Sequence, residues 1–123
     1  MPARILVAED GATFRAALVR MLGRAGYEVE AVASGEAALA RLVDPSAPGV
    51  DLLLADINLP GRSGTDVIAA ARSELESAPA CVFMSGSLLD ASAAGDRHEA
   101  ILVKPFGADE LLAAVSGALA GPT

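Results

Sequence analysis

Side chains that can do chemistry come directly after four apolar runs of the sequence. They are two neighbouring acids, an aspartate, a serine and the only lysine of the chain: Glu9, Asp10, Asp56, Ser85 and Lys104. Carboxylates that lie close together repel one another unless a cation neutralises them, and hard oxygen ligands suit Mg²⁺ or Mn²⁺. With such an ion in place, an aspartate can attack phosphorus as a nucleophile, while the ammonium and the hydroxyl meet the oxygens of the transferred group. The residue types therefore predict phosphoryl transfer.

The four apolar runs have the length and composition of buried strands. They span residues 4–8, 50–55, 80–84 and 101–103. A fifth segment, residues 27–32, alternates between apolar and polar positions like a half-exposed strand. In an open parallel sheet, functional groups gather beyond the carboxyl ends of the strands. The predicted strands therefore direct the reactive side chains to one edge of the sheet.

Apolar residues at helical spacing fill the intervals between these strands. We expect helices over residues 12–25, 65–76 and 108–119, and another that follows Ser34 as its N-cap. Gly26 is expected to end the first helix. Strands and helices that alternate through short loops imply right-handed crossovers and a mostly parallel sheet with helices on both faces. The 123 residues predict a single α/β domain over residues 1–123, without a linker.

Four short motifs at the ends of predicted strands resemble the response-regulator receiver family of two-component signal transduction. They are Ala8-Glu9-Asp10, Asp56-Ile57-Asn58-Leu59-Pro60-Gly61, Met84-Ser85-Gly86 and Lys104-Pro105-Phe106. The motifs occur in the family's order, and the resemblance covers essentially the whole chain. It implies a doubly wound, chemotaxis-regulator-like fold with five parallel strands in the flavodoxin-like order 2-1-3-4-5. It also implies a phosphorelay function, in either a stand-alone regulator or a domain of a hybrid kinase.

The resemblance implies a metal site of Mg²⁺, with Mn²⁺ as a possible substitute. Asp10, Asp56 and the backbone carbonyl of Asn58 would be its ligands, and Glu9 would act through water.

The resemblance also implies the roles of the residues that meet the phosphoryl group. Asp56 would accept it from the phosphohistidine of a histidine kinase or a histidine phosphotransfer protein, with help from Lys104 and Ser85. Water would later hydrolyse the acyl phosphate, so the chain would catalyse only its own phosphotransfer and dephosphorylation and would not be an enzyme otherwise. The peptide bond before Pro105 is expected to be cis.

Two positions differ from the family's pattern. Ile101 stands three residues before the lysine, where the family usually has a switch aromatic, so an aromatic gate is not expected there. The interval from Ser85 to Lys104 is shorter than is common in the family, and residues 88–99 have poor helical spacing. The fourth helix is therefore expected to be short or irregular. The face around the fourth and fifth helices is the expected surface for a downstream protein partner.

Composition argues against several other classes of protein. A net charge of −7 would repel a phosphate backbone, which disfavours nucleic-acid binding. No stretch approaches the roughly 20 apolar residues of a membrane span, and the N-terminal residues do not resemble a signal peptide, so we expect a cytoplasmic protein without membrane association. Cys81, the only cysteine, cannot form an intramolecular disulfide. His98 has no second histidine or cysteine near it in the sequence and is expected to be an exposed side chain.

Two alternative functions remain open on the sequence. The first is a receiver-like interaction module that acts independently of phosphorylation, which Ile101 and the irregular fourth segment suggest. The second is a small phosphatase of similar topology, although such enzymes usually carry a second acid two residues after the nucleophile, where this chain has Asn58. A dinucleotide site is disfavoured because Glu9-Asp10-Gly11-Ala12-Thr13 offers no glycine-rich phosphate cradle.

Overall fold

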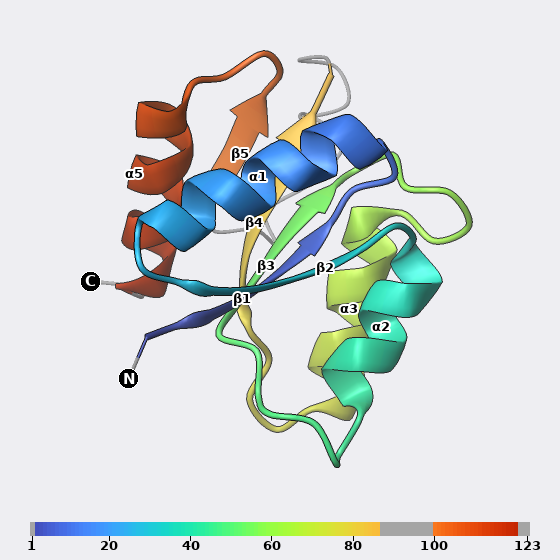
Figure 1. Cartoon of the computed structure of the whole chain (residues 1–123). Coiled ribbons are helices and arrows are strands. Elements are labelled where there is room, and N and C mark those ends of the chain that lie inside the picture. Colours follow the sequence, from blue (N-terminus) through green and yellow to red (C-terminus); the bar gives the residue numbers. More distant parts are fainter. Residues whose placement is uncertain (1, 87–99, 121–123) are drawn as a thin grey trace.

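The computed structural model describes residues 2–86 and 100–120 (Figure 1). Its strands are β1 (Arg4–Ala8), β2 (Glu28–Val32), β3 (Leu52–Asp56), β4 (Ala80–Ser85) and β5 (Ala100–Val103). Its helices are α1 (Ala12–Arg24), α2 (Gly35–Val43), α3 (Gly64–Glu74) and α5 (Ala108–Leu119). These bounds agree with the predicted elements to within two residues at each end. The predicted irregular segment at residues 88–99, with His98, lies outside the described residues.

The five strands form one parallel sheet. Their order is β2-β1-β3-β4-β5, which confirms the doubly wound topology that the resemblance implied. The chain first moves outward to β2 and then crosses back over β1 to β3, so the strand order reverses between β1 and β3. This reversal leaves a crevice at the carboxyl ends of the two strands, which is where ligands bind in open α/β sheets.

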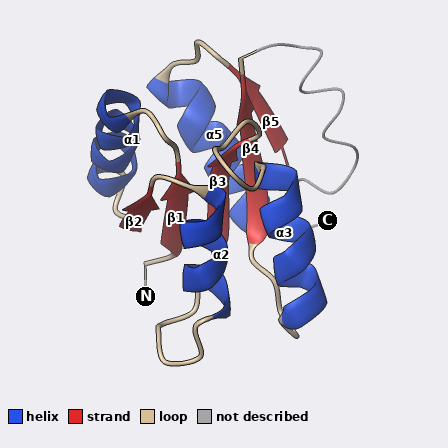
Figure 2. Cartoon of the chain, turned by 90° about the vertical axis from the view of Figure 1, so that its right-hand side faces the viewer, coloured by secondary structure: helices blue, strands red, loops and turns tan. Residues whose placement is uncertain are grey.

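Helices cover both faces of the sheet (Figures 1 and 2). Helices α2 and α3 pack on one face, where Leu53 and Ala55 of β3 contribute to the core. Helices α1 and α5 pack on the other face, to which Leu52 and Leu54 of the same strand contribute. Because successive residues of a strand point to opposite faces, a strand between two helical layers must be apolar at every position. This requirement explains the continuous apolar runs of the sequence.

Local sequence signals set the two helix ends nearest to β2. Helix α1 gives way to Gly26, which has a φ of 100° and donates its backbone N–H to the carbonyl of Gly23. A side chain at this left-handed position would be strained, so glycine is the residue that lets the chain turn into β2. Helix α2 begins after Ser34, whose hydroxyl accepts a hydrogen bond of 3.2 Å from the backbone N–H of Ala37.

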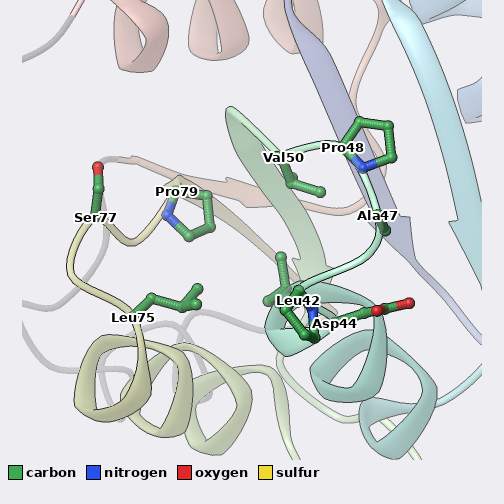
Figure 3. A pocket seen from close by; sticks show the side chains of 10 residues that line it. Leu42, Asp44, Ala47, Pro48, Val50, Leu75, Ser77 and Pro79 are labelled. Atoms are coloured by element: carbon green, nitrogen blue, oxygen red, sulfur yellow. The ribbon is translucent and has the colours of Figure 1, made fainter.

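A hollow of about 200 Å³ lies at the amino-terminal edge of the sheet (Figure 3). The connection between α2 and β3 lines one side of it with Pro48 and Val50, and the connection between α3 and β4 lines the other with Leu75 and Pro79. These segments precede β3 and β4. The hollow therefore lies at the opposite edge from the carboxyl ends where the reactive side chains were predicted.

No helix in residues 2–86 and 100–120 is both long and apolar enough to cross a membrane.

Candidate functional site

The carboxyl ends of β1, β3, β4 and β5 lie along the same edge of the sheet (Figure 1). Backbone hydrogen bonds continue the sheet beyond these ends. The N–H of Lys104 donates to the carbonyl of Ser85 over 2.7 Å, and the N–H of Ile57 donates to the carbonyl of Met84 over 2.9 Å. Residues that are far apart in the sequence therefore lie side by side at this edge.

Lys104 lies between two buried carboxylates. Its Nζ is 2.5 Å from Oδ2 of Asp56 and 3.1 Å from Oε1 of Glu9. The two acids are 7% and 3% exposed. The second oxygen of each carboxylate accepts a hydrogen bond of 2.8 Å from the backbone N–H two residues further along the chain. Asn58 donates to Asp56, and Gly11 donates to Glu9. Every oxygen of the two carboxylates therefore accepts a hydrogen bond, which offsets the cost of burying the charges.

The charges of this cluster do not balance. Burial raises the pKa of Glu9, and the hydrogen bonds from Gly11 and Lys104 offset this only in part. Burial alone would lower the pKa of Lys104, but its hydrogen bonds to Asp56 and Glu9 outweigh burial and raise it. The lysine is therefore held in its charged form, and it is closer to Asp56 than to Glu9. One ammonium does not fully compensate two buried carboxylates.

The predicted metal ligands lie next to this cluster with different exposures. Asp10 follows Glu9 and has an exposed side chain, whereas Asp56 is buried. Asn58 is joined to Asp56 through its own backbone N–H. Within residues 2–86 and 100–120, no three acidic, histidine or cysteine side chains are gathered as a preassembled metal cluster. In the structure described here, the ammonium of Lys104 is the cation between Glu9 and Asp56.

The remaining predicted residues lie on β4, on β5 and just after it. Ser85 is the last residue of β4 and is fully buried. Ile101 is partly buried and packs against the core on the side of α2 and α3. The peptide bond between Lys104 and Pro105 is cis, as the resemblance implies.

Arg15 hydrogen-bonds the backbone of Glu9 and Asp10. Its position in the sequence did not predict this contact. Arg15 lies on α1, and its guanidinium donates to the carbonyl of Glu9 over 3.0 Å and to that of Asp10 over 3.4 Å. The arginine thereby holds the backbone of both acids against the first turns of α1. An arginine four residues into a predicted helix is usually a solvated charge, so the sequence carried no specific signal for this contact.

Helix α2 holds the loop that follows Asp56, which is a second contact that the sequence did not reveal. Gly61 has a φ of 76°, and the carboxylate of Glu36 lies directly against it. The same carboxylate accepts a 3.4 Å hydrogen bond from the backbone N–H of Arg62. Gly35 lies so close to the backbone of Arg62 that a Cβ there would be 2.8 Å from the carbonyl carbon. The first residues of α2 therefore fix the position of this loop.

Replacing Glu9 with glutamine is expected to stabilise the metal-free protein at pH 7 by on the order of 1 kcal/mol. Because burial raises the pKa of Glu9 above its ordinary value of 4.5, the folded state binds more protons than the unfolded state between these two pKa values. Stability is therefore greatest below the unfolded pKa and falls as pH rises through the folded pKa. Glutamine keeps the oxygen that accepts the N–H of Gly11 but carries no charge.

Thermal unfolding in the presence of a chelator at pH 3.5 and pH 7 tests this expectation. The gain should be present at pH 7 and absent at pH 3.5. Glu76→Gln, at an exposed position after α3, is the control and should change little at either pH. An equal gain for Glu9→Gln at both pH values would show that ionisation is not its cause.

Comparisons with known proteins agree with this geometry. The sequence model of the response regulator receiver domain matches residues 5–116. The transcriptional regulatory protein PrrA of Mycobacterium tuberculosis is 36% identical over 118 residues, which are 94% of this chain and 49% of PrrA. The chain therefore spans about half the length of this curated relative.

Solved structures give the same result. A response regulator receiver protein from Sinorhizobium medicae is 30% identical, with a TM-score of 0.85 over 98% of this chain and 96% of that one. The response regulator TrrA of Thermotoga maritima, solved in complex with Mg²⁺-BeF, is 29% identical, with a TM-score of 0.80 over 93% and 96% of the two chains. Sheet order, polar cluster, sequence match and structural match agree, and the chain belongs to the response regulator receiver domain family of two-component signalling.

Proposed function

We propose that Asp56 accepts a phosphoryl group from a phosphohistidine donor and that the acyl phosphate changes the affinity of the chain for a protein partner. The observation that carries the proposal is the buried carboxylate of Asp56 at the end of β3, hydrogen-bonded to the only lysine of the chain and adjacent to Glu9. A carboxylate in this position is a nucleophile with a cation already beside it.

The transfer would proceed by in-line displacement at phosphorus. An oxygen of Asp56 forms the new bond to phosphorus while the bond from phosphorus to the donor imidazole nitrogen breaks. The imidazole leaves as the neutral base because its other ring nitrogen already carries a proton. The ammonium of Lys104 lies 2.5 Å from Oδ2 of Asp56, so it can meet the charge of the incoming phosphoryl oxygens. The hydroxyl of Ser85 is proposed to bind one of these oxygens. Hydrolysis of the acyl phosphate by water returns the carboxylate and inorganic phosphate.

The donor set of this edge fits Mg²⁺. The buried carboxylates of Glu9 and Asp56 share one ammonium, which leaves excess negative charge, and the exposed carboxylate of Asp10 follows Glu9 directly in the chain. Carboxylate oxygens are ligands of the kind that Mg²⁺ prefers. We propose that Asp10, Asp56 and the carbonyl of Asn58 hold the ion and that Glu9 acts through water, with Mn²⁺ as a substitute. When bound, the ion would neutralise charge on the phosphoryl oxygens. The Mg²⁺-BeF complex of the Thermotoga maritima relative supports Mg²⁺ as the ion.

The proposed phosphodonor is a histidine kinase or a histidine phosphotransfer protein. Residues 1–123 would form one receiver domain that catalyses only its own phosphorylation and dephosphorylation. A downstream protein would bind the face around α5 and the fourth helix that the sequence predicts. Ile101, which stands in place of the usual switch aromatic, packs on the side of α2 and α3.

Intact-mass measurement after incubation with acetyl phosphate tests the proposal. The parent chain should gain one phosphoryl group when Mg²⁺ is present and none when it is chelated, and the adduct should be stable in acid and labile in base. Asp56→Asn should gain none. Asp51→Asn is the matched control, since Asp51 immediately precedes the opposite end of the same strand and is exposed.

Either of two results would contradict the proposal. An adduct that persists in Asp56→Asn would place the phosphoryl group elsewhere. A parent chain that binds Mg²⁺ but forms no adduct would favour an interaction module that acts independently of phosphorylation.

A further inference from the structure

The ammonium of Lys104 has an aromatic ring on one side in addition to its two carboxylates. Its Nζ lies 4.9 Å from the centroid of the Phe14 ring. At this distance a cation is attracted to the negative face of an aromatic ring. Phe14 lies in the first turn of α1 and is half-buried. The ring therefore supplies a third contact to an ammonium that has three N–H donors.

A second ring fixes the orientation of the first. The centroids of Phe14 and Phe106 are 5.8 Å apart and the ring planes meet at 67°, which is the favoured edge-to-face arrangement. Phe106 follows Lys104 by two residues. The segment after β5 therefore contains both Lys104 and Phe106, the residue that packs against the Phe14 ring.

The aromatic residues of the chain are concentrated at this lysine. The sequence has three phenylalanines, one tyrosine and no tryptophan, and two of these four rings are Phe14 and Phe106. The third phenylalanine, Phe83, is fully buried in the core, where leucine and valine supply most of the remaining volume. The core of this protein therefore packs mainly without aromatic rings. We infer that the two rings near Lys104 serve the lysine through the negative charge on the face of a ring and do not only fill volume.

We propose that Phe14, held edge-on by Phe106, is a positioning residue that keeps the ammonium of Lys104 beside Asp56 while phosphoryl transfer takes place. The inference rests on the proposed function. During transfer an oxygen of Asp56 becomes part of the bond to phosphorus, so the ammonium must exchange that partner for phosphoryl oxygens. The ring contact does not change during this exchange. It therefore limits how far the ammonium moves when its carboxylate partner is consumed.

Replacement of Phe14 separates the contribution of the ring from that of apolar volume. Phe14→Leu keeps an apolar side chain of similar reach and removes the ring, whereas Phe14→Tyr keeps the ring. With saturating Mg²⁺ and acetyl phosphate, the rate of adduct formation should fall about fivefold in Phe14→Leu, which corresponds to about 1 kcal/mol. The rate should return to the parent value in Phe14→Tyr. The acetyl phosphate concentration that gives half the maximal rate should change little, because the ring does not touch the donor.

NMR of the lysine side chain provides a readout that does not depend on activity. Because Lys104 is the only lysine, protein grown with ¹³C-labelled lysine gives one set of lysine side-chain signals. In the parent and in Phe14→Tyr, the ring current should shift the ε-methylene protons away from the values of free lysine. In Phe14→Leu these signals should move toward the free values, while thermal unfolding shows that the variant is folded.

The two measurements distinguish failure of this inference from failure of the proposed function. A parent chain that takes up no phosphoryl group overturns both. A parent chain that is phosphorylated, with an unchanged rate in Phe14→Leu, overturns the inference alone. So do lysine signals that are the same in the parent and in Phe14→Leu. A rate that falls equally in Phe14→Leu and Phe14→Tyr also overturns it, since the effect would then follow from packing and not from the ring.

Discussion

Replacing Lys104 with methionine is expected to lower the free energy of unfolding by about 3 kcal/mol when divalent cations are removed. The variant leaves the carboxylates of Glu9 and Asp56, which are 3% and 7% exposed, without their shared ammonium. Each would keep one backbone N–H donor but would face a second buried negative charge. Methionine preserves most of the apolar stem, so the loss reports mainly on charge. Urea unfolding at pH 7 with a chelator measures the change.

Added Mg²⁺ should restore more stability to Lys104→Met than to the parent chain. A ligand that binds only the folded state stabilises it by an amount that grows with its affinity. In the parent, Lys104 occupies the space between Glu9 and Asp56, and a metal ion must share their charge with it. The methionine variant should therefore bind Mg²⁺ more tightly, even as phosphorylation by acetyl phosphate slows by about a hundredfold through loss of a charge-stabilising donor.

Two controls separate these effects. Lys104→Arg keeps the positive charge and should lose less stability, while Arg20→Met removes a positive charge from an exposed position on α1 and should change little. Equal stabilisation of the parent and of Lys104→Met by Mg²⁺ would show that the lysine and the ion do not share the same carboxylates.

The sequence was sufficient to predict that Glu9, Asp56 and Lys104 lie together at one edge of the sheet, because strand ends impose strong constraints. A run buried between two helical layers must be apolar throughout, so the first ionisable residue after it marks the edge of the sheet. This reasoning placed Asp56 and Lys104 together although they are 48 residues apart, and the structure joins them directly. The parallel direction of the strands supplies the rest, since it places all of their carboxyl ends along one edge of the sheet.

Contacts that depend on the path of a loop were not predictable in this way. The sequence places Phe14, Arg15 and Glu36 on helices at positions where each has an ordinary interpretation, as an apolar or a solvated residue. Their actual partners depend on how the segments after β1, β3 and β5 bend. The left-handed turn at Gly61, for example, brings the backbone of Arg62 to Glu36. The sequence shows that a glycine is present, but it does not show which residue packs closely against that glycine.

Gly35→Ala is expected to destabilise the protein by about 2 kcal/mol, although alanine is the better helix former. An added Cβ would lie 2.8 Å from both the carbonyl carbon and the Cβ of Arg62, and closer still to its carbonyl oxygen. Since backbone cannot rotate away as a side chain tip can, either α2 or the loop after β3 must move. That loop begins directly after Asp56, so we also expect slower phosphorylation. Urea unfolding and the acetyl phosphate assay measure the two effects.

Gly117→Ala is the matched control because it changes the same residue type at another helical position. Gly117 lies in α5, and nothing lies within 4 Å of a Cβ added there. The substitution should stabilise the protein by about 0.5–1 kcal/mol through the lower entropy of the unfolded chain and should leave the phosphorylation rate unchanged. The opposite sign of the two substitutions is the diagnostic result. If Gly35→Ala were also stabilising, the contact between the start of α2 and the backbone of Arg62 would not hold the loop in place. The position of the loop would then have to be set by α3 alone.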